Sequence, residues 1–133
     1  MCVFCKIANG EIPSYKVYED EEHLAFLDIS QATIGHTLVI PKKHYENFFA
    51  LDEEEAAQLM KVVALVSKKL KAALNFEAFN ILNNSGALAG QTVNHVHFHL
   101  LPRYTDDGLV MHFAGKKLSD AEFKDLLGKI NSK

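Results

Sequence analysis

Three histidines alternate with apolar residues in the stretch NHVHFHL, residues 94–100. This two-residue period is typical of a β-strand with one polar and one apolar face, because neighbouring side chains of a strand point to opposite sides. A helix would scatter the same positions around its circumference. The pattern therefore predicts a strand with His95, His97 and His99 on one face, neighbours roughly 6.5 to 7 Å apart.

Two simpler explanations of the histidines compete with a substrate site. One is a chance cluster on a solvated strand face, which rarely selects histidine three times. The other is a three-histidine metal site, which the spacing disfavours because side chains so far apart do not converge on one ion unaided. The spacing fits a substrate site better, in which each imidazole contacts a different group of an extended substrate.

The rest of the chain predicts an α+β fold, a five-stranded antiparallel sheet with one long helix and a short C-terminal helix. Four further runs have strand character, and they cover residues 15–19, 23–29, 36–41 and 77–84. The long helix is predicted over residues 52–74, where Asp52 and Glu55 form a capping box. Its apolar stripe consists of Leu59, Val63, Val66, Leu70 and Leu74. Ser119 and Glu122 begin the last helix, which carries Phe123, Leu126 and Ile130.

Length and composition narrow the class of protein. The 133 residues predict a single domain over residues 1–133, and 48% hydrophobic with 23% charged residues is an ordinary globular composition. The formal charge of −3 argues against a broad nucleic-acid-binding surface. No run is long and apolar enough to predict a membrane span, and the N-terminus lacks the core of a signal peptide. We therefore expect a cytoplasmic protein whose two cysteines are thiols or metal ligands.

A polar loop leads into the histidine stretch. It contains small or hydrogen-bonding residues that can direct N–H groups, amides and a hydroxyl at an anion, namely Asn83, Asn84, Ser85, Gly86, Gly90, Gln91 and Thr92. Alone, such a loop is most simply a turn, and it lacks the lysine of a P-loop. Beside three histidines, phosphate binding is the better interpretation.

These features together resemble the histidine triad (HIT) superfamily, whose signature His-φ-His-φ-His-φ-φ matches residues 95–101. The segments FCKIANGEIPSYKVYED, LAFLDISQATIGHTLVIPKKH and AGQTVNHVHFHLLPR also resemble the family, in the family's order. The N-terminal half looks closest to the Hint-like nucleoside phosphoramidate hydrolases and bacterial Hit proteins. AGQTV and LPR also resemble the branch that cleaves dinucleoside polyphosphates, and the tail lacks the tryptophan-containing end of the animal phosphoramidases.

The resemblance implies a homodimeric nucleotide hydrolase or transferase that acts at the α-phosphate of purine nucleotide derivatives through a nucleotidyl-histidine intermediate. His97 matches the nucleophile, and His99 and His36 match the flanking histidines. The phosphate-binding loop corresponds to Asn84, Gly90, Gln91 and Thr92. Asp28 matches the acidic residue that accepts hydrogen bonds from the ribose. The base pocket corresponds to Phe4, Ile7, Phe26, Ile29 and Leu38, each of which could equally be ordinary core packing.

Cys2 and Cys5 have a C-x2-C spacing that suits one tetrahedral ion, although two buried thiols or a redox pair have the same spacing. Some bacterial triad proteins and the galactose-1-phosphate uridylyltransferases resemble this chain in pairing such cysteines with two histidines. The matching set is Cys2, Cys5, His44 and His95, which implies a structural zinc and no organic cofactor.

A protein of another class shares most of these features. A purine-nucleotide-binding regulatory or scaffold protein would need the loop and the pocket, with hydrolysis only incidental. The complete nucleophile set favours an enzyme, because binding alone does not require His97. Neither reading involves nucleic acid or a membrane.

Overall fold

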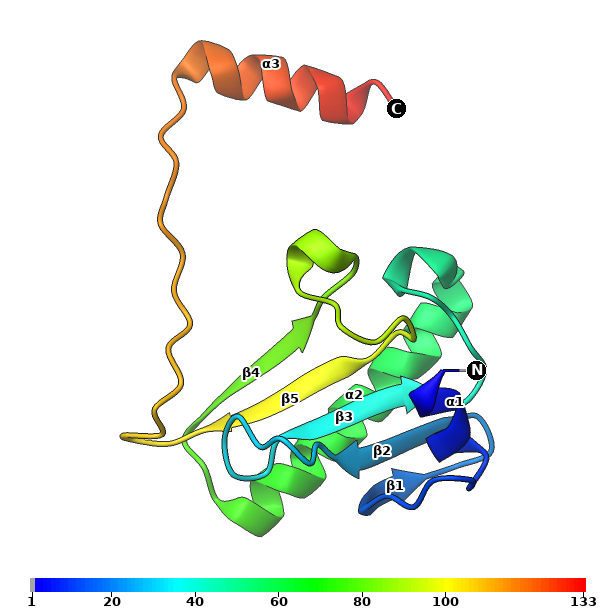
Figure 1. The fold of residues 1–133 in the computed structure, drawn as a ribbon. Helices are drawn as coiled ribbons and strands as arrows, with labels where there is room; N and C mark the ends of the chain where they lie inside the picture. The colour runs from blue at the N-terminus through cyan, green and yellow to red at the C-terminus, as the bar shows by residue number, and fades with distance from the viewer. Residues whose placement is uncertain (1) are drawn as a thin grey trace.

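Five antiparallel strands form one open sheet in the order β1-β2-β3-β5-β4, and the sheet carries a long helix on one face (Figure 1). The computed structural model describes residues 2–133. The strands are β1 (Lys16–Glu19), β2 (His23–Leu27), β3 (Thr37–Pro41), β4 (Ala78–Asn83) and β5 (Phe98–Arg103). The predicted α+β class and antiparallel sheet are confirmed, with strand ends displaced by one or two residues except in β5.

Helix α2 (Glu53–Leu74) begins and ends where its sequence indicates. Asp52 and Glu55 form the predicted capping box, and Asn75 ends the helix in the left-handed conformation with φ 52°. Its buried side contains Leu59, Val62, Val63, Val66 and Leu70. Leu74, predicted to belong to this stripe, is 38% exposed, whereas Val62, placed outside it, is buried. The stripe follows the 3.6-residue period over the sheet and ends before the last turn.

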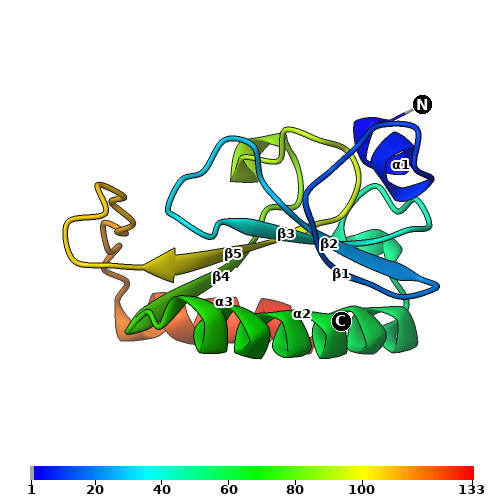
Figure 2. The same ribbon diagram turned by 90° about the horizontal axis from the view of Figure 1, so that it is seen from below.

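The middle of the sheet is covered on both faces, as Figure 2 shows with α2 below the sheet and α1 above it. Val39 of β3 belongs to the cluster that packs with α2, while its neighbour Leu38 belongs to a second cluster with Phe4 of α1 (Val3–Ala8). All five residues of β3 are buried for this reason. Helix α1 was not predicted, because six residues are too few to show a helical period.

Two short 3₁₀ helices, η1 (Phe48–Ala50) and η2 (Ala87–Ala89), lie in the loops around the sheet. Helix α3 (Asp120–Asn131) starts at the predicted capping box of Ser119 and Glu122, and it stands away from the body at the end of an extended segment (Figure 1). Among residues 2–133, no helix combines the length and apolarity needed to span a membrane.

Candidate active site and a cysteine–histidine cluster

The three histidines of the signature lie on the side of the sheet away from α2, but only one of them is within a strand. Strand β5 begins only at Phe98, so His99 lies in the strand, His97 just precedes it, and His95 lies in a bend. The rings of His97 and His99 are neighbours, with centroids 5.0 Å apart. The predicted alternation is retained, because Val96, Phe98 and Leu100 belong to the core cluster beside α2, while Phe4 of α1 contacts the rings of both His95 and His97 on the other side. The predicted strand does not reach His95, whose N–H bonds to the Val93 carbonyl at 2.9 Å in a bend.

His97 is held in one tautomer by its own backbone. Its Nδ1 lies 2.7 Å from the carbonyl oxygen of His95. A carbonyl only accepts, so Nδ1 carries the proton and Nε2 is left with its lone pair. The ring is 4% exposed and packs edge-on against Phe4, with ring centroids 5.1 Å apart. The result is an oriented imidazole with an unprotonated nitrogen.

His36 connects the loop before β3 to His99. The Ala32 N–H donates to Nδ1 of His36 at 3.2 Å, so the proton of this ring lies on Nε2. That Nε2–H is 2.9 Å from Nδ1 of His99 and 3.6 Å from Oδ2 of Asp28. His99 therefore accepts through Nδ1 and keeps a proton on Nε2 that it can donate to a ligand. The predicted trio of His97, His99 and His36 is brought together, with Asp28 beside it.

Burial keeps this group of imidazoles neutral. It lowers the pKa of His99 to about 4, and the neighbouring His97 and His36 add to the effect. Burial likewise lowers the pKa of His36, although the Asp28 carboxylate opposes the shift. The pKa of His97 is also lowered by burial, against the opposing hydrogen bond to the His95 carbonyl. At pH 7 the site therefore presents neutral nitrogen bases and N–H donors.

Gln91 organises the polar loop from inside. Its Oε1 accepts from the Gly86 N–H at 2.8 Å, and its Nε2 donates to the carbonyls of Glu46 at 2.7 Å and Val93 at 2.9 Å. The side chain is buried and its donors are already used. Gln91 thus belongs to the predicted loop, but its side chain shapes the loop and cannot also donate to a phosphate.

Two of the predicted phosphate-binding residues, Asn84 and Thr92, have side chains that are not committed to the protein. Among residues 2–133, the side chains of Asn84 and Thr92 make no hydrogen bond to protein. Gly90 has φ +98°, which favours glycine, and a Cβ there would lie 3.4 Å from the Asn84 amide nitrogen. The side chains of Asn84 and Thr92 are therefore available to contact a phosphate, whereas the Gly90 N–H is already bonded to the Ala87 carbonyl at 3.0 Å.

Four of the five predicted base-pocket residues lie together. Phe4, Phe26 and Leu38 are buried in the cluster on the α1 side of the sheet, and Ile7 packs against it. Ile29 lies outside this cluster and is 89% exposed. Phe4, Phe26 and Leu38 already pack in the core. Of the five predicted residues, Ile29 therefore has the most exposed apolar surface available to contact a ligand.

Two amides support the site, of which Asn83 was predicted only as part of the polar loop and Gln31 was missed in the sequence. The Asn83 Nδ2 donates to the His97 carbonyl at 2.9 Å, and Gln31 joins both ends of the loop before β3. Its Nε2 donates to the carbonyls of Asp28 and His36, and its Oε1 accepts from the Gly35 N–H. The position of Gln31 three residues after Asp28 was the available signal, but amides in polar loops are common and mark no chemistry alone.

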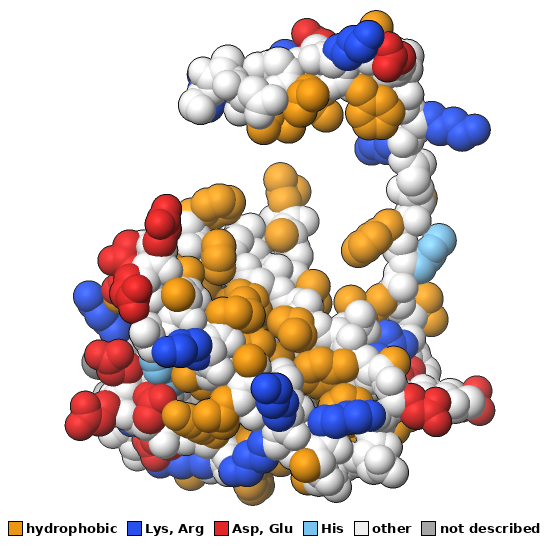
Figure 3. All heavy atoms as spheres, turned by 180° about the vertical axis from the view of Figure 1, so that it is seen from behind, with side chains coloured by type: hydrophobic (Ala, Val, Ile, Leu, Met, Phe, Trp, Pro, Cys, Tyr) orange, Lys and Arg blue, Asp and Glu red, His pale blue; other side chains and the backbone are white. Residues whose placement is uncertain are grey.

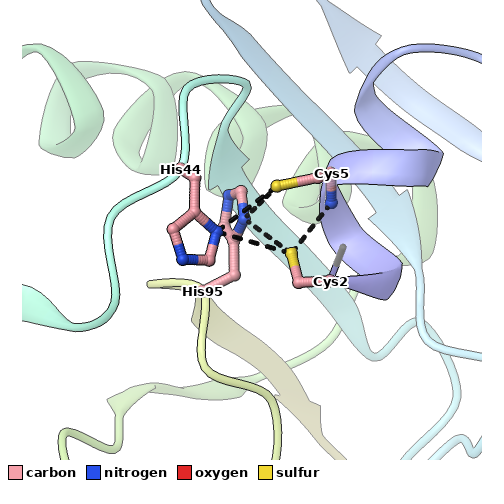
Figure 4. A group of neighbouring side chains, drawn as sticks. All are labelled: Cys2, Cys5, His44 and His95. Atoms are coloured by element: carbon pink, nitrogen blue, oxygen red, sulfur yellow. Dashed lines mark hydrogen bonds between the residues drawn. The ribbon is translucent and has the colours of Figure 1, made fainter.

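Cys2, Cys5, His44 and His95 converge from three separate parts of the chain (Figure 4). The Cys2 sulfur is 3.5 Å from Nδ1 of His44 and 3.3 Å from Nδ1 of His95. The Cys5 sulfur is 3.3 Å and 3.6 Å from the same two atoms. His95 donates its Nε2–H to the Pro41 carbonyl at 2.8 Å, so its Nδ1 lone pair faces the sulfurs.

This arrangement fits a tetrahedral zinc ion. With Zn–S near 2.3 Å and Zn–N near 2.05 Å, a tetrahedron has S···N edges of about 3.5 Å, which all four observed distances approach. Burial and, to a smaller extent, the contacts with Cys2 raise the pKa of the Cys5 thiol to about 11. The two thiols would therefore need a bound cation to lose their protons at neutral pH.

Comparison with known proteins agrees with this fold. The HIT domain family matches residues 9–106. An uncharacterised HIT-like protein of Methanocaldococcus jannaschii is 53% identical over 92% of this chain and 94% of its own length. An adenosine 5′-monophosphoramidase of Schizosaccharomyces pombe is 41% identical over 99% of this chain and 97% of its own. The crystal structure of a HIT family member from Bacillus subtilis, 42% identical, superposes with a TM-score of 0.94, covering 99% of this chain and 96% of that one. The chain belongs to the HIT domain family.

Proposed function

We propose that this protein hydrolyses purine nucleoside phosphoramidates at the α-phosphate through a nucleotidyl intermediate on His97. The observation that carries the proposal is the tautomer of His97, whose Nδ1–H bonds to the His95 carbonyl at 2.7 Å and leaves Nε2 as a nucleophile. The relative from Schizosaccharomyces pombe that is called an adenosine 5′-monophosphoramidase supports the choice of substrate class.

The reaction proceeds in two displacements. Nε2 of His97 attacks the α-phosphorus, a P–N(His97) bond forms, and the P–N bond to the leaving group breaks as the amine departs with the proton from Nε2 of His99. Water then attacks the phosphorus and gives a proton to Nε2 of His99, the P–N(His97) bond breaks, and the nucleoside monophosphate leaves with the lone pair of His97 Nε2 restored. Each displacement is easier than one direct attack by water.

The surrounding groups have assigned roles in both steps. The His95 carbonyl stabilises the positive charge that Nδ1–H acquires while the phosphorus is bound. The Nε2–H of His99 donates to a phosphoryl oxygen or to the departing group, and His36 holds His99 in the required tautomer. Asp28 accepts from the ribose hydroxyls, and Asn84, Gly90 and Thr92 surround the phosphate.

Turnover of two substrates by one preparation tests the proposal. Adenosine 5′-phosphoramidate should be hydrolysed with a higher kcat/KM than diadenosine polyphosphate, and acid quenching should trap adenylate on His97. A preference for diadenosine polyphosphate would place the chain with the dinucleoside polyphosphate hydrolases. Tight nucleotide binding without turnover of either compound would reject the enzyme and favour a regulatory nucleotide-binding role.

We also propose that Cys2, Cys5, His44 and His95 hold a structural zinc ion. The ion would tie α1, the loop after β3 and the bend before β5 together, next to the proposed active site. The four S···N distances of 3.3 to 3.6 Å support the proposal. Metal analysis of protein purified without chelators should find about one zinc per chain.

The homodimer is a further proposal, and a cytoplasmic location stays a prediction. Exposed apolar side chains on α2 and on the edge strand β4 support self-association: Met60, Leu65 and Ile81 are 42%, 50% and 50% exposed. Sedimentation at micromolar concentration should give twice the chain mass of 14.9 kDa.

A further inference from the structure

A cavity lies between the β1–β2 turn and the first turns of α2. Its volume is about 430 Å³, which is within the range of small-molecule sites. The wall also includes the start of β2 and the end of β3. The cavity is therefore on the α2 side of the sheet, opposite the histidines of the proposed active site.

His23 is a buried polar residue in the wall of this cavity, and it is only 7% exposed. Ala25, two residues along β2, belongs to the core cluster beside α2, so the alternation of the strand turns His23 to the same side. Nδ1 of His23 lies 3.2 Å from Oδ1 of Asp20, whereas Nε2 makes no hydrogen bond to residues 2–133. One ring nitrogen is thus held by the protein, and the other is available to a group inside the cavity.

Asp20 fixes the tautomer of His23. Its carboxylate accepts from the Tyr18 hydroxyl at 2.7 Å and from the N–H groups of Glu22 at 2.8 Å and His23 at 2.7 Å. A carboxylate only accepts, so Nδ1 of His23 carries a proton and the neutral ring keeps a lone pair on Nε2. Buried polar groups of native proteins are nearly always hydrogen-bonded. The position of Nε2 therefore favours a ligand that brings an N–H or O–H donor.

Three carboxylates of the wall are available to a ligand. The side chains of Glu21 and Glu22 are exposed and form no hydrogen bond or ion pair within the described chain. Glu54 of α2 accepts one hydrogen bond, from Nε2 of Gln58 at 2.9 Å. Glu55 is not available, because its side chain closes the capping box of α2. The three available carboxylates thus come from two sides of the cavity, the β1–β2 turn and α2.

The two lysines of the wall do not cancel this negative charge. The wall contains four carboxylates and two lysines, so a formal charge of −2 remains. Nζ of Lys42 is already paired with Oε2 of Glu19 at 2.8 Å, and Nζ of Lys43 lies 5.3 Å from the centre of the Tyr45 ring. Figure 3, which views the molecule from the α2 side, shows acidic side chains gathered at one side of the body, with a histidine among them. The cavity therefore favours a cation over an anion.

We propose that this cavity binds an aliphatic diamine or polyamine. One ammonium group donates to Nε2 of His23 beside the carboxylates of the β1–β2 turn, and a second pairs with Glu54 on α2. Pro41 and Leu51 also line the cavity and offer apolar surface to the methylene chain. A ligand with a positive group at each end meets both acidic sides, which favours a diamine over a monoamine. The proposal does not depend on the proposed reaction, because the cavity is on the other side of the sheet.

Titration of the full-length ¹⁵N-labelled protein with 1,4-diaminobutane, followed by NMR, tests the site. The amide signals of residues 20–23 and 54–58 should shift and saturate along one binding curve. Butylamine should bind more weakly because it has one charge, and 1,4-butanediol should give no saturable shift. The absence of a saturable shift with the diamine, or equal binding of the diol, would overturn the proposal. Zinc chloride would also overturn it if the ion alone saturated these signals, since that result would identify a metal site.

Matched variants separate binding in the cavity from general attraction to acidic residues. Glu54→Gln should weaken diamine binding roughly threefold, whereas Glu53→Gln, at an exposed neighbour outside the wall, should leave it unchanged. His23→Asn keeps an amide that can donate to Asp20 but removes the Nε2 acceptor, and it should weaken binding about tenfold. Equal dissociation constants for the two glutamate variants would overturn the proposal. This pair of exposed glutamates decides the question even if His23→Asn fails to fold.

Discussion

His95 and His97 are two residues apart, both are buried, and each donates one ring N–H to a backbone carbonyl, yet they present opposite nitrogens. His95 donates through Nε2 to Pro41 and presents Nδ1 to two sulfurs. His97 donates through Nδ1 to the His95 carbonyl and presents Nε2. The difference teaches that the position of one carbonyl selects which nitrogen of a neutral imidazole is available, and so whether the ring suits a metal or a phosphorus atom.

The two sites are also physically joined. The carbonyl that orients His97 belongs to His95, whose imidazole lies in the cysteine cluster. Phe4 of α1 packs edge-on against both rings, with centroids 5.9 Å from His95 and 5.1 Å from His97. Helix α1 therefore borders the proposed active site through Phe4 and the proposed metal site through Cys2 and Cys5.

The largest expected effect tests whether His97 is the nucleophile. His97→Ala should lower kcat for adenosine 5′-phosphoramidate by roughly 10³-fold or more, because the covalent route is lost while the pocket remains. Calorimetric titration should show nucleotide binding largely retained. His112→Ala, an exposed histidine outside the triad, is the control and should behave as wild type. A near-normal kcat for His97→Ala would remove the nucleophile assignment.

The next largest effect tests whether His95 and the two cysteines hold a metal ion. Cys5→Ser should lose the zinc and lower the Tm by about 10 °C, since the ion would no longer tie α1 to the sheet. Metal analysis and thermal unfolding, with chelator-treated wild type as the matched sample, measure this. If the untreated wild-type protein contains no metal and Cys5→Ser melts at the same temperature, the cysteines are packing residues only.

A smaller effect separates the exposed from the buried members of the predicted base pocket. Ile29→Ser should raise KM about tenfold, because an aliphatic side chain that is 89% exposed would be covered only by the nucleotide base. The Tm should shift by less than about 2 °C, since the residue lies outside the core. An unchanged KM would show that Ile29 does not contact the substrate.

The last prediction concerns pH. The pKa of His99 is lowered from 6.5 to about 4 in the folded protein, chiefly by burial. Between these values the unfolded chain binds a proton that the folded chain does not, so stability should fall as pH drops from about 6.5 to about 4 and then level off. Urea unfolding of wild type and His99→Asn at several pH values isolates this contribution, because acid effects on other groups cancel in the difference. Parallel curves for the two proteins would contradict it.

Regular elements with a clear period were predictable from the sequence. The capping box at Asp52 and Glu55 and the apolar stripe from Leu59 to Leu70 mark α2 through local hydrogen bonds and spacing alone. The alternation at His97 and His99 likewise survives in the structure. Helix α1 was not predictable in this way, because it is short and its burial of Phe4 depends on a second core on the far side of the sheet.

The site shows the same division between local and distant information. The sequence by itself determined that imidazoles, thiols and a glycine-containing polar loop are available, and that His97 and His99 project to the same side. Only the tertiary structure decided that His95 turns toward Cys2 and Cys5, because that choice depends on a bend before β5 and on the Pro41 carbonyl, 54 residues away along the chain. Tautomers, ligand sets and the use of the Gln91 amide follow from which groups meet after folding, and contacts over such separations leave no period in the sequence to read.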